Sequence, residues 1–127
     1  MIFNSSDHAE RFGAAIQTAG AVRDDDTIKG DFGASLFILT GLPSVYRRVE
    51  KHIHGSYIDF EPMLHMGLSA GETILVALAG NLYNGGFFDH YTPQDIVNYC
   101  DADGVLLAAQ AMNLRKRRLD INTIFSS

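Results

Sequence analysis

Residues 69–86 read SAGETILVALAGNLYNGG and contain the clearest helix signal in the chain. Ser69 begins a capping box: its hydroxyl can accept a hydrogen bond from the amide of Glu72, whose carboxylate reaches back to the amide of Ser69. The stretch that follows is apolar on nearly every side, which is typical of a helix enclosed by other helices. Asn84-Gly85-Gly86 ends it, because glycine suits the backbone conformation of a helix C-terminus. We therefore predict a central, buried helix over about residues 70–84.

Similar start and stop signals divide the rest of the chain into helices joined by short connections. Ser5 or Ser6 can cap a first helix, which Gly20 ends, because serine hydroxyls accept hydrogen bonds from the free amides at a helix start. Prolines suit the first helical turn, so Pro43 and Pro93 mark two further starts. We expect the remaining helices at about residues 31–40, 43–53, 93–100 and 101–118.

The last of these helices and two other segments carry weaker signals. The apolar residues of the last helix recur at helical spacing, so we expect its inner face to comprise Val105, Leu106, Ala109 and Met112. Residues 56–66 contain a strand-like run without an obvious partner strand, and we expect an extended loop or a small hairpin there. Residues 119–127 alternate weakly and are expected to form a flexible or docked tail.

Length and composition bound the fold class. The chain has 127 residues, the size of one domain, and 46% of them are hydrophobic, which is enough apolar material for one core. Only 20% are charged, unlike the composition of a disordered chain. We therefore predict an all-α fold. It is expected to be a single compact domain over residues 1–127, with five or six helices around a central apolar helix and at most a minor hairpin.

The same composition limits the compartment and the partners. The single cysteine, Cys100, cannot form an internal disulfide, and the first residues lack the apolar run of a signal peptide, so a cytoplasmic protein is expected. The most apolar stretch, residues 73–82, is about half as long as a bilayer span, which argues against a membrane partner. A net charge of −5 makes direct binding to nucleic acid unfavourable. A homo-oligomer stays open.

Two groups of residues could carry catalysis, and neither has a complete pattern. His52-Ile53-His54 could chelate a metal ion in an extended segment, but on a helix the two histidines point about 200° apart. Cys100 lacks the flanking signatures of catalytic cysteines and is typical of a small core residue. We assign no catalytic residue, no metal ligand and no cofactor. The alternative is a small metal-dependent hydrolase that uses His52, His54 or His65 with nearby carboxylates.

Residues 81–88 form the most unusual segment, because two glycines lie among aromatic residues. It could be a recognition loop, since aromatic side chains are enriched at the energetic centres of interfaces. The alternative is a helix C-terminus followed by a hydrophobic plug that returns the chain to the core. The basic residues 115–118 could supply charged contacts or stay solvated. The candidate partner-binding residues are Tyr83, Phe87, Phe88, Arg115, Lys116 and Arg118.

Several segments of the chain form a set that is similar to a known family. These segments are Phe3-Asn4-Ser5 with His8 and Arg11-Phe12, residues 34–39 after the aspartate-rich loop, residues 69–72, residues 81–85 and residues 108–115. The most specific of them is Asn81-Leu82-Tyr83-Asn84-Gly85. Over about residues 2–115 the chain resembles a family of short uncharacterised proteins, a domain of unknown function from Gram-positive bacteria and their phages or mobile elements. The family supplies no catalytic or binding residues. The resemblance implies a small, phage-associated accessory protein.

The predicted function is a small non-enzymatic protein-binding module. As a phage or mobile-element accessory protein, it would modulate a larger host protein such as a defence enzyme. Small size, mild acidity, separated charge clusters and the lack of a catalytic pattern favour this interpretation. Besides the hydrolase, a second alternative is a self-associating structural protein that buries its apolar loop in a homodimer.

Overall fold

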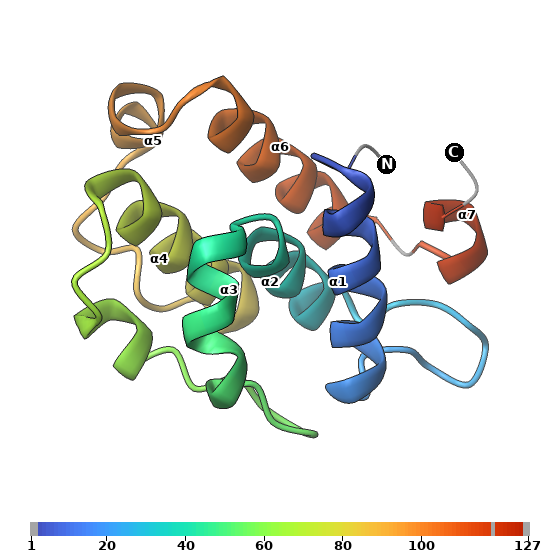
Figure 1. Cartoon of the computed structure of the whole chain (residues 1–127). Coiled ribbons are helices and arrows are strands. Elements are labelled where there is room, and N and C mark those ends of the chain that lie inside the picture. Colours follow the sequence, from blue (N-terminus) through green and yellow to red (C-terminus); the bar gives the residue numbers. More distant parts are fainter. Residues whose placement is uncertain (1–2, 118, 126–127) are drawn as a thin grey trace.

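The computed structural model describes residues 3–117 and 119–125, and within them the chain is a single all-α domain (Figure 1). These residues form seven α-helices and two short 3-10 helices, with no strand. The α-helices are α1 (Ser6–Thr18), α2 (Gly30–Thr40), α3 (Pro43–Val49), α4 (Ala70–Asn84), α5 (Pro93–Tyr99), α6 (Ala102–Lys116) and α7 (Ile121–Phe125). The 3-10 helices are η1 (Glu50–His52) and η2 (Pro62–His65).

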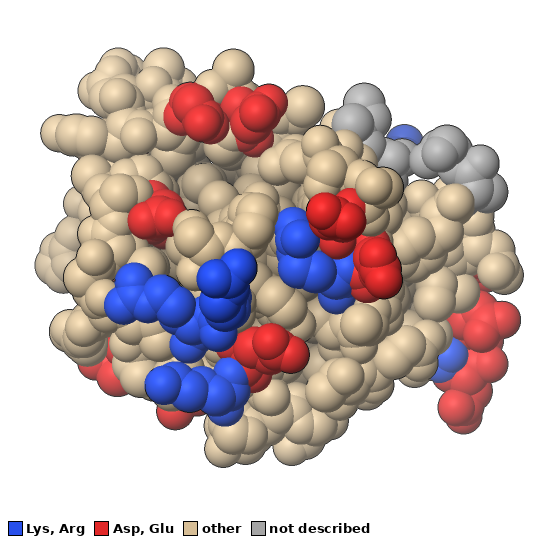
Figure 2. Space-filling view, in the orientation of Figure 1, with Lys and Arg blue, Asp and Glu red and all other residues tan. Residues whose placement is uncertain are grey.

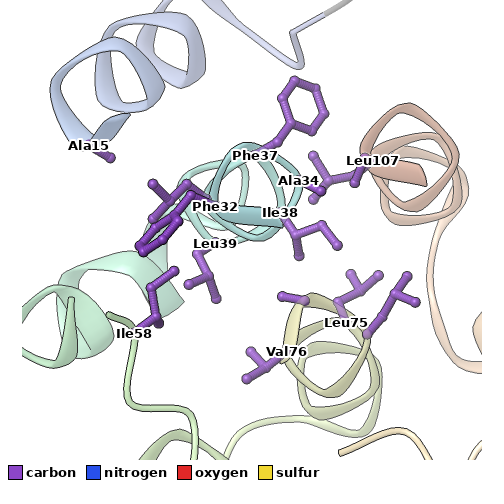
Figure 3. Close-up of a cluster of buried hydrophobic side chains, with 14 of the residues drawn as sticks. Ala15, Phe32, Ala34, Phe37, Ile38, Leu39, Ile58, Leu75, Val76 and Leu107 are labelled. Carbon is purple, nitrogen blue, oxygen red and sulfur yellow. The ribbon is translucent and has the colours of Figure 1, made fainter. Parts of the chain in front are cut away.

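The helix at the centre of the fold is α2. Its residues 32–40 are all buried, and α1, α3, α4 and α6 pack around it. Figure 3 looks along α2 and shows Ala15 of α1, Leu107 of α6 and Val76 of α4 on three different sides of it. Burying each large apolar side chain stabilises the fold by about 1.5–3 kcal/mol, so this enclosed helix contributes much of the hydrophobic free energy of folding.

Close packing on α2 depends on its small residues. A Cβ atom at Gly33 would lie 2.8 Å from Leu114 Cδ2, and one at Gly41 would lie 2.5 Å from Leu107 Cδ1. Glycine at these two positions lets α6 approach the backbone of α2. The buried hydroxyl of Ser35 in α2 is paired with α4, since Ser35 Oγ donates to the carbonyl of Ala79 over 2.7 Å.

The predicted helix α4 has the expected bounds, with the capping box present in both directions. Its residues 74–80 are buried, as the apolar sequence indicates. It lies beside α2 rather than at the centre, because the more polar ends of α4 are only partly covered. Gly85 follows it with φ +87°, and its N–H donates to Asn81 O over 2.7 Å.

The expected inner face of the last helix is wrong. Leu106, Ala109 and Met112 are exposed and Val105 is half-buried. The buried face of α6 comprises Gly104, Leu107, Ala108, Ala111 and Leu114. Both faces are apolar, so helical spacing alone cannot distinguish them. The face with more small residues fits against the neighbouring helices, and a Cβ atom at Gly104 would already lie 3.1 Å from Cys100 Cβ.

Most other helix bounds lie within two residues of the expected ones. Ser5 caps α1 by accepting from the amide of His8, and α6 ends at Lys116. The helix that begins at Pro43 becomes the 3-10 helix η1 after Val49. Within residues 56–66, where an extended loop or small hairpin was expected, Ile58 forms a single antiparallel bridge with Ile53, and residues 62–65 form η2.

The C-terminal segment docks on the domain and adds the seventh helix. Ile124 of α7 is buried in the core, and Ile121 N–H donates to Asp26 O over 2.8 Å. Just before it, Ile28 N–H donates to Leu119 O over 3.0 Å. In the part of the chain that the structure describes, no helix is both long and apolar enough to cross a lipid bilayer.

Candidate functional site

A small pocket with basic walls lies where the C-terminal end of α6 meets the loop before α2. It has a volume of about 190 Å³ and is lined by Arg23, Ile28, Gly30, Arg115, Lys116 and Arg117. We call it the basic pocket. Its four cationic side chains come from two segments about ninety residues apart in the chain. No carboxylate is among these lining residues, so this pocket has one sign of charge.

Hydrogen bonds to backbone carbonyls hold two of the arginines in place. Arg23 Nη1 donates to Ile28 O over 3.1 Å, and Arg115 Nε donates to Leu82 O over 3.0 Å. A guanidinium carries five N–H donors, so these bonds engage only part of each group. Each bond restricts its side chain before a ligand arrives, which lowers the entropy cost of binding one.

Local sequence explains why these residues meet. Arg115 and Lys116 occupy the last turn of α6, where cations interact favourably with the helix dipole. Arg23 opens a tight turn in which its N–H donates to Thr27 O over 2.8 Å. Asp25 accepts from both the amide and the hydroxyl of Thr27, which stabilises that turn. The turn thus places Arg23 beside the end of α6.

Of the six predicted partner-binding residues, two lie at the basic pocket. Arg115 and Lys116 line it and are exposed. Tyr83 directly follows Leu82, the acceptor for Arg115. Its ring is half-buried against Phe32, with centroids 5.2 Å apart, and its hydroxyl accepts from Ile58 N–H over 3.3 Å. Arg118 lies outside the described residues.

Phe87 and Phe88 pack on their own chain. Phe87 lies against Phe60, with centroids 5.7 Å apart, and covers Gly80, where a Cβ atom would lie 2.8 Å from Phe87 Cδ2. Phe88 contacts the ring of Tyr91. Both side chains are half-buried. This arrangement is that of a helix end followed by a hydrophobic plug, and it leaves only part of each ring for a partner.

The histidines do not assemble into a site among the described residues, where no group of three or more His, Cys, Asp or Glu side chains could hold a metal ion. His54 stacks on Tyr57, with centroids 4.4 Å apart, and the exposed His65 pairs with Glu61 over 3.2 Å. His52 is half-buried in η1. The structure therefore offers no support for the hydrolase alternative at these positions.

Cys100 lies in a cleft of about 350 Å³ where the N-terminal ends of α3, α4 and α6 come together. Burial raises the pKa of its thiol, and the nearby Asp101 carboxylate raises it further. The thiol therefore stays protonated at neutral pH, and its Sγ donates to Gly71 O over 3.6 Å. A protonated thiol is a poor nucleophile, so this environment does not favour catalysis.

A groove of about 480 Å³ lies between α1 and α3 and has mixed charge. Figure 2 shows Lys and Arg side chains gathered over α3, with acidic side chains along the neighbouring α1. The groove itself is lined by Asp7, Glu10 and Glu50 against Arg11 and Arg47. Because the opposite charges nearly balance, this groove favours no charged ligand as strongly as the basic pocket does.

One exposed apolar surface was not expected from the sequence. It is the outer face of α6, which comprises Ala102, Val105, Leu106, Ala109, Met112, Asn113 and Lys116. Leu106 is 41% exposed and Met112 is 45% exposed, and Tyr99, just before the helix, is 59% exposed. The sequence signal for this surface is the apolar stripe of Val105, Leu106, Ala109 and Met112, which helical spacing alone places in the core.

Comparison with known proteins found no match among protein families, curated proteins or solved structures. The resemblance to the phage-associated family stays a prediction.

Proposed function

We propose that the chain is a non-enzymatic protein-binding module that holds an acidic segment of a larger protein in the basic pocket. The observation that carries this proposal is the convergence of Arg23, Arg115, Lys116 and Arg117 on one pocket lined by no carboxylate. Arginine recognises carboxylates through paired N–H donors, and charge-assisted hydrogen bonds are among the strongest polar contacts in proteins.

The surroundings of the pocket favour an acidic protein segment over a nucleic acid. The chain has a net charge of −5, and Asp24, Asp25 and Asp26 are exposed in the same turn as Arg23. These carboxylates confine the positive surface to the pocket itself, whereas a continuous run of phosphates needs an extended positive surface. A volume of about 190 Å³ suits one or two acidic side chains.

The biological setting is proposed on the sequence resemblance alone. In that setting the chain is a cytoplasmic accessory protein of a phage or mobile element, and it modulates a larger host protein such as a defence enzyme. The acidic segment in the basic pocket then belongs to that host protein.

A pair of charge-matched double variants tests the pocket. Lys116→Ser with Arg117→Ser removes two cations from the pocket, and Arg47→Ser with Lys51→Ser removes two exposed cations from α3 and η1. Binding of a fluorescent peptide rich in glutamate is measured by anisotropy. We expect the pocket variant to bind about tenfold more weakly than wild type, since losing one charge-assisted hydrogen bond costs about 1.5 kcal/mol. The α3 variant should bind like wild type.

The same proteins identify the natural partner. Tagged wild type and both double variants are used to capture proteins from a Gram-positive lysate, with and without phage infection, followed by mass spectrometry. We expect a protein that is retained by wild type and by the α3 variant and lost from the pocket variant. Equal peptide affinity and equal capture by the two double variants would overturn the proposal, provided that both melt at the wild-type temperature.

A further inference from the structure

On the outer face of α6, residues of similar size lie at equal distances before and after Ala109 in the sequence. Counted from Ala109, the large apolar residues Leu106 and Met112 lie three positions before and three positions after it. Ala102 and Lys116 lie seven positions before and seven after. Because an α-helix turns 100° per residue, these five residues share one face. A face with this spacing can pack against a copy of itself that runs in the opposite direction.

Charge at the two ends of this face is complementary under that same reversal. Asp101 is exposed at the N-terminal end of α6, where its Oδ1 accepts from Gly104 N–H over 2.8 Å. Lys116 is exposed at the C-terminal end. An antiparallel copy would therefore place its Lys116 on the same flank as Asp101. Two parallel copies would place like charges together, which disfavours that orientation.

The size of the side chains also suits a close helix pair. Ala109 at the centre and Ala102 near the end are small, so two helix axes could approach to about 8 Å. Leu106 and Met112 flank the centre and would fill the space on either side of it. In Figure 1, α6 forms the upper edge of the molecule, with α2 and α4 on its inner side.

We propose that the outer face of α6 is a self-association surface, on which a second copy of this chain docks with its own α6 antiparallel. The twofold axis passes at Ala109, so that each Leu106 packs against the Met112 of the other copy. A helix of 15 residues is about 22 Å long, so the interface is smaller than the standard 1,600 Å² or so. The dissociation constant is therefore expected in the micromolar range. This proposal does not depend on the basic pocket binding an acidic segment.

Charged substitutions at the twofold axis test the proposal, because like charges should weaken the dimer and opposite charges should restore it. In Ala109→Glu, two carboxylates would face each other across the axis, and in Ala109→Lys, two ammonium groups would. Glutamate and lysine are good helix formers and residue 109 is exposed, so both variants should fold. Sedimentation equilibrium over about 1 µM to 1 mM is expected to show wild type dimerising and each variant dimerising at least tenfold more weakly. An equimolar mixture of the two variants should regain a dimer.

Matched controls are Gln17→Glu and Gln17→Lys, which place the same charges on the exposed side of α1. We expect both controls to dimerise like wild type. Wild type that stays monomeric to 1 mM would overturn the proposal, whether or not another protein binds this face. The proposal would also be overturned if Ala109→Glu dimerises as strongly as wild type. It would be overturned as well if the mixture of Ala109→Glu and Ala109→Lys has a dissociation constant no lower than that of each variant alone.

Discussion

At the scale of single residues, His8 is the most unusual side chain of the core. It is completely buried, with its ring against Phe37 at 4.7 Å between centroids and against Phe3 at 5.1 Å. Nδ1 accepts from Asn4 N–H over 3.0 Å, so the proton is on Nε2, which donates to Phe37 O over 2.9 Å. Protonation of Nδ1 would point a second N–H at the donor on Asn4. The neutral ring thus links the start of α1 to the centre of α2.

We expect His8 to make the fold sensitive to acid. Desolvation by burial is the main cause that lowers its pKa from 6.5 to about 4. Between these values the unfolded chain binds a proton that the folded chain does not, so the stability is complete above pH 6.5 and falls as the pH drops toward 4. Urea unfolding should show a loss of about 2 kcal/mol between pH 7 and pH 5, since one pKa unit equals about 1.4 kcal/mol.

The variant His8→Asn isolates this effect, because asparagine does not titrate. It should be less stable than wild type at pH 7 and should lose about 2 kcal/mol less between pH 7 and pH 5. If wild type and His8→Asn lose the same stability over this range, other groups cause the acid sensitivity and the interpretation of His8 is wrong.

At the scale of elements, the contact between α4 and α5 depends on Gly71. A Cβ atom there would lie 2.6 Å from the carbonyl oxygen of Tyr99, which is backbone and cannot rotate away. We expect Gly71→Ala to destabilise the fold by about 1–3 kcal/mol, although alanine is the better helix former. Thermal unfolding measures the change. Gly55→Ala is the control, since nothing lies within 4 Å of a Cβ atom at Gly55, and an equal loss in the control would contradict the steric explanation.

The bounds of the helices were predictable because their signals are local. Ser69 and Glu72 are three residues apart, and Pro43 and Pro93 mark starts wherever the helix lies in the fold. The buried face of a helix depends instead on what it meets. For α6, with apolar residues on both sides, only the distant residues of α2 decide that Leu107 is buried and Leu106 is not.

The candidate site was predictable to a similar extent. Arg115 and Lys116 are recognisable from the sequence as a basic helix end, and the structure places both at the basic pocket. Arg23 could not be identified, because its proximity to them arises from the packing of α2 against α6. As an aromatic residue beside two glycines, Phe87 is predicted to bind a partner. Its φ of +73° and its contact with Gly80 instead show that it packs on its own chain.

At the scale of the whole molecule, α7 packs against α1 and against the residue Phe3 that precedes it. Phe125 of α7 stacks on Phe3, with centroids 5.5 Å apart, and a Cβ atom at Gly13 would lie 3.4 Å from the ring of Phe125. Figure 1 shows α7 beside α1. The neighbouring residue Ile124 anchors α7 in the core, where its side chain is buried.

Removing the apolar contact of α7 should therefore weaken the entire domain. We expect Ile124→Ala to lower the free energy of unfolding by about 2–4 kcal/mol, the usual cost of truncating a buried isoleucine. Urea denaturation of Ile124→Ala and of the exposed control Asn122→Ala gives the comparison. A loss below 0.5 kcal/mol for Ile124→Ala would show that α7 is only loosely attached.

The central position of α2 also determines when the protein can fold during its synthesis. Residues 32–40 leave the ribosome before α6, which covers one side of them and ends at residue 116. At about 5–20 residues per second, the nascent chain would carry this apolar helix without its cover for about 4 to 15 s. During that time it is exposed to other nascent chains, so chaperones that hold apolar segments would act on it. The native core can close only after α6 has been translated.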